Sequence, residues 1–417
     1  MLVRAPAKQS AQGVRAVNAG LVLNEIWTAS GRISRADIAR STGLSRSTIS
    51  AIVGELLEAG LVEETHVART RAGRPPIVLA FRDDAFTSIG IEMGSSHVTV
   101  VACDARGNVR SRRRREWDVA GDAAGTLALM GTFVSACLED AKNTTIIGIG
   151  IAVPCPLDTS EVGTLSRRIL PAWEGINLVE RMTAEHDLPI LVENDANMGA
   201  LAEHWWGACT GEGFATYIKV ATGVGAGHII DGQLFRGATG IAGEIGHTVV
   251  ADAGGHLCRC GLHGCLEAEV GSAAIVAQAN ERLDKGSQST LQGGPGLTLA
   301  HVLAEAGNGD QVSVEVIAQA GAHLGIAVAN LLNLMNPARV VIGGRLAAAG
   351  DLLLAPLRAT IRERALWSSI ARADVVLSDL GEEHVALGAA TLVLGSALAA
   401  PQNLNQRSTR WGASWAK

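Results

Sequence analysis

The chain of 417 residues is too long for one ordinary hydrophobic core, so we expect two or three domains. Its composition, 47% hydrophobic and 18% charged, is typical of a soluble globular protein, and no apolar run reaches the roughly 20 residues of a transmembrane helix. The net charge of −6 is unevenly divided, because residues 1–82 carry 11 Lys and Arg against 6 Asp and Glu. A basic segment before an acidic body favours a nucleic-acid-binding module joined to a second function.

The N-terminal 20 residues lack the apolar core and the small-residue cleavage site of a signal peptide. We therefore expect a cytoplasmic protein that does not engage a membrane. Residues 33–62 then predict two short helices around a tight turn, with Ser34 and Ser45 as N-caps and Gly43 at the position that needs a positive φ. With a third helix over residues 14–29, the pattern predicts a helix-turn-helix.

The second helix of this motif begins with a polar, outward-facing turn. Recognition helices contact DNA in this way, with arginine for guanine or phosphate and hydroxyls for phosphate. Residues 61–81 form two extended runs around an arginine-rich loop, the pattern of a wing that enters the minor groove. A helical hairpin that contacts another protein is the alternative. The predicted DNA contacts are Arg35, Ser45, Arg46, Ser47, Thr48, Ser50, Arg71 and Arg74.

From Thr87 onward, strand-like runs alternate with helical ones. Such alternation is typical of α/β sheets that have a cleft at the carboxyl ends of their strands. The arginine run at residues 112–115 lies between two strand-like segments, and we interpret it as a solvated turn. Strands are predicted within residues 88–109, 146–154, 216–237 and 339–350, and a strand running into a helix within residues 188–207.

Three of the seven cysteines gather in one short segment with three histidines, GHTVVADAGGHLCRCGLHGCLEAEV at residues 246–270. The other four cysteines lie singly among apolar neighbours, as buried free thiols do. In a reducing compartment, clustered cysteines favour a metal over a disulfide. A cluster of reduced thiols without metal is the alternative.

Three motifs of the body resemble those of the ROK family (repressors, open reading frames and sugar kinases). They are ENDAN at residues 193–197, GEIGH at 243–247 and CRCGLHGC at 258–265. The basic head resembles that of the transcriptional-repressor branch of this family. The resemblance implies an α/β protein in which an N-terminal winged helix-turn-helix precedes a two-lobed, actin-like ATPase (ribonuclease H-like) ROK fold.

The resemblance also implies a domain division. It assigns residues 1–82 to the DNA-binding domain, 83–197 to the first lobe with a helix near 383–399 returning to it, 198–382 to the second lobe with the metal motif, and 400–417 to a poorly ordered tail.

In this family the Asn-Asp pair and the GExGH motif meet a sugar, and in its kinases the aspartate is the general base. The resemblance therefore implies a sugar site of Asn194, Asp195, Glu244, His247 and Glu267, although each residue alone could be a helix cap or a surface acid. It implies a zinc site of His247, Cys258, Cys260 and Cys265, with His256 and His263 as less favoured substitutes. Three thiolates and an imidazole leave no position for an activated water, as in structural zinc sites.

An active kinase of the family is expected to have an Asp-x-Gly-Gly-Thr turn after the first strand of the body. This chain has Glu92-Met93-Gly94-Ser95-Ser96, in which a side chain replaces the second glycine that lets the backbone approach a phosphate. The second glycine-rich loop, residues 221–227, and the pair Gly343-Gly344 are better kept. We therefore expect no kinase activity.

These observations together predict a sugar-responsive transcriptional regulator, most simply a repressor of a carbohydrate uptake or catabolism operon. Operator DNA and a monosaccharide or sugar derivative are its expected ligands, and a homodimer or homotetramer its expected assembly. One alternative is a zinc-containing, ATP-dependent sugar kinase with an appended DNA-binding domain, in which Asp195 is the base. Another is a regulator controlled by a partner protein that docks on the body.

Overall fold

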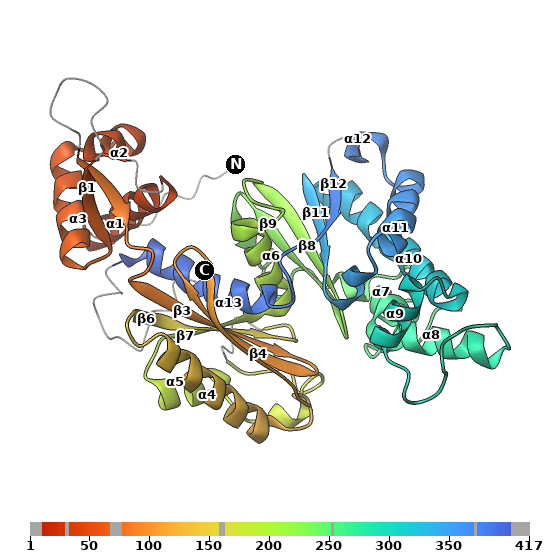
Figure 1. Cartoon of the computed structure of the whole chain (residues 1–417). Coiled ribbons are helices and arrows are strands. Elements are labelled where there is room, and N and C mark those ends of the chain that lie inside the picture. The colour runs from red at the N-terminus through yellow and green to blue at the C-terminus, as the bar shows by residue number, and fades with distance from the viewer. Residues whose placement is uncertain are drawn as a thin grey trace.

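The structure is a computed structural model that describes residues 11–29, 33–66, 77–157, 163–251, 254–370 and 373–401. These residues form a small, mainly helical head and two units that are each built on a five-stranded sheet (Figure 1). The predicted combination of an N-terminal helix-turn-helix with an α/β body is confirmed.

The head consists of α1 (Ala11–Thr28), α2 (Arg35–Thr42), α3 (Arg46–Glu58) and the antiparallel strands β1 (Val62–His66) and β2 (Ile77–Phe81). The loop between β1 and β2, which includes the predicted contacts at 71 and 74, lies outside the described residues.

Local signals explain how the helices of the head begin and end. The Ser34 side chain accepts a hydrogen bond from the backbone of Asp37 and forms a capping box with it, and the Ser45 side chain caps α3 through the backbone N–H of Thr48. Gly43 ends α2 with a φ of 70°, the left-handed conformation that glycine adopts without strain. Ile49 on α3 is fully buried in a hydrophobic core that the head shares with residues of the body, among them Phe86 and Val393.

The first unit has the strand order β5-β4-β3-β6-β7, in which β3 pairs antiparallel with β4 and parallel with β6. The helix α4 covers β4 and β5, and α5 packs beside β7. The elements are β3 (Phe86–Gly94), β4 (His97–Asp104), β5 (Val109–Glu116), α4 (Ala123–Asp140), β6 (Thr145–Val153), η1 (Pro171–Trp173), α5 (Leu178–His186) and β7 (Ile190–Asn194).

The interpretation of the arginine run as a solvated turn is wrong. Residues 112–115 lie in β5, an edge strand that pairs antiparallel with β4. Backbone hydrogen bonds hold this strand whatever its side chains, and charged side chains suit a sheet edge. Acidic neighbours from other elements compensate the arginines, as in the pairs of Arg112 with Glu383 and Arg113 with Asp140.

The second unit has the strand order β10-β9-β8-β11-β12. Its helices gather on one side of this sheet (Figure 1). The elements are β8 (Phe214–Val220), β9 (Val224–Ile230), β10 (Gln233–Phe235), η2 (Ile245–His247), α7 (Leu266–Val270), α8 (Ser272–Asp284), α9 (Leu299–Gly307), α10 (Gln311–Met335), β11 (Arg339–Gly343), η3 (Arg345–Ala349), α11 (Asp351–Arg364), α12 (Trp367–Ile370) and β12 (Asp374–Leu377).

The helix α10 is the one described helix that is long and apolar enough to cross a membrane by length and composition. However, 61% of its apolar window is buried inside the fold, and its side chains belong to the hydrophobic core of the second unit. A mostly buried helix of this kind is typical of the core of a globular domain.

Two helices lie between the sheets, α6 (Asp195–Trp206) and α13 (His384–Ala399). α13 packs on β3 and β6, α6 packs on β8 and β9, and the two helices pack on each other. A Cβ atom at Gly90 or Gly150 would lie 1.9 Å from a carbonyl oxygen of α13, so glycine is needed at these positions for the helix to approach the sheet. The stacking brings the carboxyl end of β7 close to the glycine-rich turn between β8 and β9.

Candidate ligand and metal site

Asn194 and Asp195 lie where β7 runs into α6. The Asn194 side chain caps α6, since its Oδ1 accepts hydrogen bonds from the backbone N–H groups of Ala196 and Asn197, and its Nδ2 donates to the carbonyl of Cys155 at 3.2 Å. The amide is therefore held rigidly. The Asp195 side chain is 14% exposed and reaches the space between the two sheets.

Lys219, near the end of β8, connects the two sheets. Its Nζ lies 2.7 Å from Oδ2 of Asp195 and 3.2 Å from Oε1 of Glu92 on β3. Burial alone would raise the pKa of Glu92, but the charge of Lys219 and the adjacent imidazole of His97 hold it well below its usual range. Burial alone would lower the pKa of Lys219, but Asp195 and Glu92 raise it above its usual range. Glu92 and Lys219 are therefore both charged at neutral pH.

Lys219 was not among the residues singled out in the sequence. The available signal was a charged residue at the end of an otherwise apolar strand, directly before the glycine-rich loop. Its two partners come from different elements, so spacing along the chain could not reveal them.

His97 fills the first predicted phosphate turn. Its Nε2 lies 3.3 Å from Oε2 of Glu92, and its ring covers Gly94 so closely that a Cβ there would lie 2.3 Å from the ring. A phosphate group needs open backbone at such a turn. In this structure the imidazole of His97 covers the turn at Gly94, and the ammonium group of Lys219 contacts Glu92, the first residue of this segment.

Glu267, at the start of α7, joins the metal segment to the second glycine-rich loop. Its carboxylate, 9% exposed, accepts hydrogen bonds from the backbone N–H of Val224 at 3.0 Å and from Nη2 of Arg259 at 2.9 Å, and Nε of Arg259 lies 2.6 Å from its other oxygen. Arg259 stands between two of the predicted metal ligands and was also missed in the sequence. Bidentate pairing of this kind fixes both partners.

Glu244 and His247 lie beside this carboxylate. Burial raises the pKa of Glu244, and the charges of Glu267 and Asp195 raise it further against the opposing effect of His247. Asp195, His247 and Glu267 therefore lie close enough to Glu244 to affect its pKa. The fifth predicted sugar-site residue, Asn194, adjoins Asp195 along the chain. Nε2 of His247 faces Oε2 of Glu244 at 3.8 Å, while its Nδ1 faces Sγ of Cys258 at 3.6 Å.

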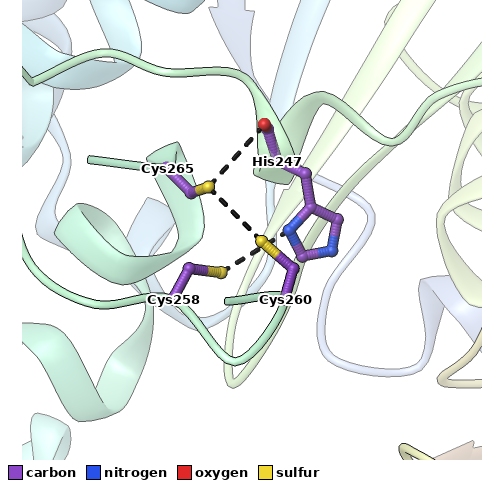
Figure 2. Close-up of side chains that lie close together, drawn as sticks. All are labelled: His247, Cys258, Cys260 and Cys265. Carbon is purple, nitrogen blue, oxygen red and sulfur yellow. Dashed lines mark hydrogen bonds between the residues drawn. The ribbon is translucent and has the colours of Figure 1, made fainter. Parts of the chain in front are cut away.

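The four predicted metal ligands point toward one another (Figure 2). Their ligand atoms all lie within 4.8 Å of one another, and the sulfurs of Cys260 and Cys265 are 3.6 Å apart. Zinc–sulfur bonds of about 2.3 Å in a tetrahedron place two sulfurs about 3.8 Å apart. His247, Cys258, Cys260 and Cys265 thus form a cluster with the donor types and spacing that a tetrahedral metal requires.

The two alternative histidines have other partners. Nδ1 of His256 lies 2.8 Å from the buried carboxylate of Glu269, and Nδ1 of His263 lies 3.0 Å from the carbonyl oxygen of Gly255. Both contacts hold the loop that carries the cysteines. The geometry of the cluster therefore favours His247 as the imidazole ligand.

The predicted DNA-contacting residues of α3 lie on its outer surface. Arg46, Ser47 and Ser50 are exposed, and Thr48 is half-buried beside them. Two others have structural partners: Ser45 caps α3, and Arg35 pairs with Glu64 of β1 at 2.7 Å. Arg71 and Arg74 lie outside the described residues.

A winged-helix head on two actin-like units, with a metal-type cluster near the charged residues that lie between their sheets, defines a regulator built on a sugar-kinase scaffold. Residues 88–396 match the ROK family and residues 16–72 the MarR family. The chain belongs to the ROK family, in the branch that carries a winged-helix head.

Individual relatives agree with this assignment. A xylose repressor from Caldicellulosiruptor bescii is 30% identical over 375 residues, which cover 89% of this chain and 94% of the repressor. The crystal structure of a ROK family transcriptional regulator, a homologue of the Escherichia coli Mlc protein, is similar with a TM-score of 0.80 and 29% identity, covering 93% of this chain and 97% of that one.

A kinase is similar over the body alone. The ROK family glucokinase from Streptomyces griseus, solved in complex with glucose and AMPPNP, has a TM-score of 0.65 and 27% identity. The match covers 73% of this chain and 98% of the glucokinase. The kinase likeness therefore accounts for the body, and the repressor likeness accounts for the body and the head together.

Proposed function

We propose that this chain is a cytoplasmic, sugar-responsive transcriptional repressor that controls an operon for carbohydrate uptake or catabolism. The observation that carries the proposal is a DNA-binding head on a sugar-kinase-like body whose first phosphate turn is filled by His97 and Lys219. The full-length likeness to repressors supports the same conclusion.

The effector is proposed to be a monosaccharide or sugar derivative that binds between the two units. A sugar presents vicinal hydroxyl groups, which pair well with carboxylates held next to amide and imidazole donors. The proposed contacts are Asn194, Asp195, Glu244, His247 and Glu267.

Phosphoryl transfer is not expected. The kinase alternative requires Asp195 to deprotonate a sugar hydroxyl, and one of its two carboxylate oxygens, Oδ2, already accepts a hydrogen bond from Lys219 at 2.7 Å. Asp195 is therefore proposed to be a hydrogen-bond acceptor for the sugar. An ATP-consumption assay over a panel of hexoses tests this point, since turnover that is abolished by Asp195→Asn would establish the kinase alternative.

The cluster of His247, Cys258, Cys260 and Cys265 is proposed to hold a structural Zn²⁺, whose contribution is to cross-link the loop without an open coordination position. His247 would then be fixed through Nδ1 and leave Nε2 for the sugar side. Arg259, carried by the same loop, would keep Glu267 in place.

Substitution of a cysteine tests the role of this loop. Cys260→Ser is expected to lose both the bound zinc and the response to sugar, because the loop that fixes His247 and Arg259 loses its cross-link. Zinc is measured by atomic emission and sugar binding by calorimetry, with the buried Cys209, which lies outside the cluster, changed to Ser as the control. A Cys260→Ser protein that lacks zinc but binds sugar normally would refute the shared role of His247.

The head is proposed to bind an operator through the exposed start of α3 and the adjoining wing, in a homodimer or homotetramer that places two heads on the DNA. The proposed contacts are Arg35, Ser45, Arg46, Ser47, Thr48, Ser50, Arg71 and Arg74.

Fluorescence anisotropy with genomic operator fragments and full-length, zinc-loaded protein tests the whole proposal. D-Xylose, D-glucose and N-acetylglucosamine are suitable first effectors, and one of a wider sugar panel is expected to weaken operator binding. Specific binding that no sugar alters, together with no heat of sugar binding in calorimetry, would favour control by a partner protein instead.

A further inference from the structure

Lys219 is placed as a counter-ion between the two units. It comes from β8 of the second sheet, and its partners are Glu92 on β3 of the first sheet and Asp195 at the start of α6. The side chains of Lys219 and Glu92 are 12% and 4% exposed, so this contact is largely shielded from water. Two carboxylates therefore share one ammonium group in a shielded place.

The charge balance at this position depends on Lys219. Nε2 of His97 lies 3.3 Å from the other carboxylate oxygen of Glu92, Oε2, and the His97 ring covers the turn at Gly94. Without the ammonium group, Glu92 and Asp195 would face each other across a shielded gap. Uncompensated buried carboxylates are costly, so the pair would take up a proton or a cation.

We propose that Lys219 acts as a tethered cation, which fixes Asp195 as an acceptor for the sugar and occupies the position between Glu92 and Asp195 where a divalent cation would otherwise bind. The part that concerns the sugar rests on the proposed function, whereas the exclusion of a divalent cation does not. Lys219 is thus a positioning residue that makes the site independent of a divalent cation. Oxygen ligands from two carboxylates suit Mg²⁺ and Mn²⁺.

Mn²⁺ alone is the probe, because its electron paramagnetic resonance signal reports binding without any sugar. Full-length, zinc-loaded wild type is expected to show no site for Mn²⁺ between the units. Lys219→Ala is expected to bind one Mn²⁺ with an affinity at least about tenfold above the weakest that the measurement detects, since it leaves both carboxylates and removes the competing charge. Lys219→Arg, which retains the charge, should exclude Mn²⁺ as wild type does.

The double variant Lys219→Ala/Glu92→Gln is the matched control, because it lacks one of the two carboxylates and is expected to lose the new site. Equal Mn²⁺ binding by wild type and Lys219→Ala, or no binding by a folded Lys219→Ala protein, would overturn the proposal. These outcomes do not depend on whether the chain responds to sugar.

Loss of folding in Lys219→Ala would also be informative. If Mn²⁺ or the added Glu92→Gln change restores the cooperative melting transition, the role of Lys219 as a counter-ion is supported. If neither restores it, while Lys219→Met folds as wild type does, the side chain acts only by filling space and the proposal fails.

Discussion

The two internal junctions of this molecule differ in chemistry. The head meets the body through an apolar junction, in which α1 shares a hydrophobic core with α13 and Trp27 contacts Trp205 and Trp206 with ring centroids 5.3 and 6.1 Å apart. The two sheets meet at the site through ions, chiefly Lys219 with Glu92 and Asp195. Apolar packing is broad and geometrically specific, whereas an ion pair can exchange its partners for ligand groups.

The head junction also contacts both units of the body. Nε1 of Trp27 donates to the carbonyl of Ala105, in the turn between β4 and β5, at 3.0 Å, and the guanidinium of Arg106 lies 4.9 Å from the Trp27 ring. The other tryptophans end α6, which packs on the second sheet. A change in the angle between the units would therefore act on the contacts of the head.

The helix α6 connects the two junctions. Its 12 residues begin at Asp195, in the proposed sugar site, and end at Trp206, in the tryptophan cluster, a span of about 18 Å at 1.5 Å per residue. If a sugar binds as proposed, we expect its effect to start at the ionic junction and to reach the apolar junction through α6.

The largest expected effect comes from breaking the apolar junction. Trp27→Ala removes the ring contacts and is expected to lower the free energy of unfolding by about 3 kcal/mol. This value is at the lower end of the range for replacing a buried tryptophan by alanine, because the Trp27 ring is only half-buried. Operator binding should survive but no longer respond to sugar. Thermal unfolding and anisotropy titrations measure the two effects, with Trp27→Phe as a control expected to cost about 1 kcal/mol for the lost hydrogen bond. A normal sugar response in Trp27→Ala would exclude this junction as the route.

Acid should weaken the ionic junction selectively. The pKa of Glu92 in the folded chain lies below its usual value of 4.5, so its stabilising contribution is complete above pH 4.5 and is lost as the pH falls further. Each unit of this pKa difference is worth about 1.4 kcal/mol. The titratable groups that act on Glu92 are Lys219, His97 and His384.

Glu92→Gln removes this titration and leaves those neighbours in place. Between pH 5 and pH 3, as an approximate working range, wild type should lose more stability in urea unfolding than Glu92→Gln does. Trp27→Ala, which leaves the ionic junction intact, should have the pH dependence of wild type. Equal slopes for wild type and Glu92→Gln would show that the contact of Glu92 with Lys219 does not stabilise the fold.

The sequence predicted the features that depend on neighbouring residues. The caps at Ser34 and Ser45, the turn at Gly43 and the three clustered cysteines are local, so spacing carried the information, whereas the choice of His247 as the fourth metal ligand came from the family resemblance. The strands predicted within residues 88–109, 146–154, 216–237 and 339–350 also followed from their apolar patterns.

Features that depend on distant elements could not be predicted in this way. Lys219 and Glu92 meet because two helices stack between two sheets, and nothing in the spacing of 127 positions indicates that contact. The arginines of β5 read as a turn because their side chains are polar, whereas the strand is held by backbone pairing to β4. The bidentate contact of Arg259 with Glu267 depends on the conformation of the metal loop.

The smallest expected effect comes from a second, exposed contact between the units. Nη2 of Arg345, which follows β11, lies 3.4 Å from Oγ of Ser96 and 3.5 Å from Oε1 of Glu116, both in the first unit. The side chains of the ion pair are 47% and 65% exposed, so Arg345→Ala is expected to cost about 0.5 kcal/mol or less.

Arg345→Ala should nevertheless change sugar affinity slightly, because it removes a contact between the units. The control is Lys285→Ala, which breaks an exposed ion pair with Glu281 at the end of α8 and should leave sugar affinity unchanged. Sugar affinity is measured by calorimetry at about 0.05 M and 0.5 M salt. Screening at the higher salt concentration should abolish the difference in sugar affinity between wild type and Arg345→Ala. A change in affinity of the same size in Lys285→Ala would mean that surface charge in general, and not the junction between the units, sets the effect. A difference that persists at high salt would mean that Arg345 contacts the sugar or its loop directly.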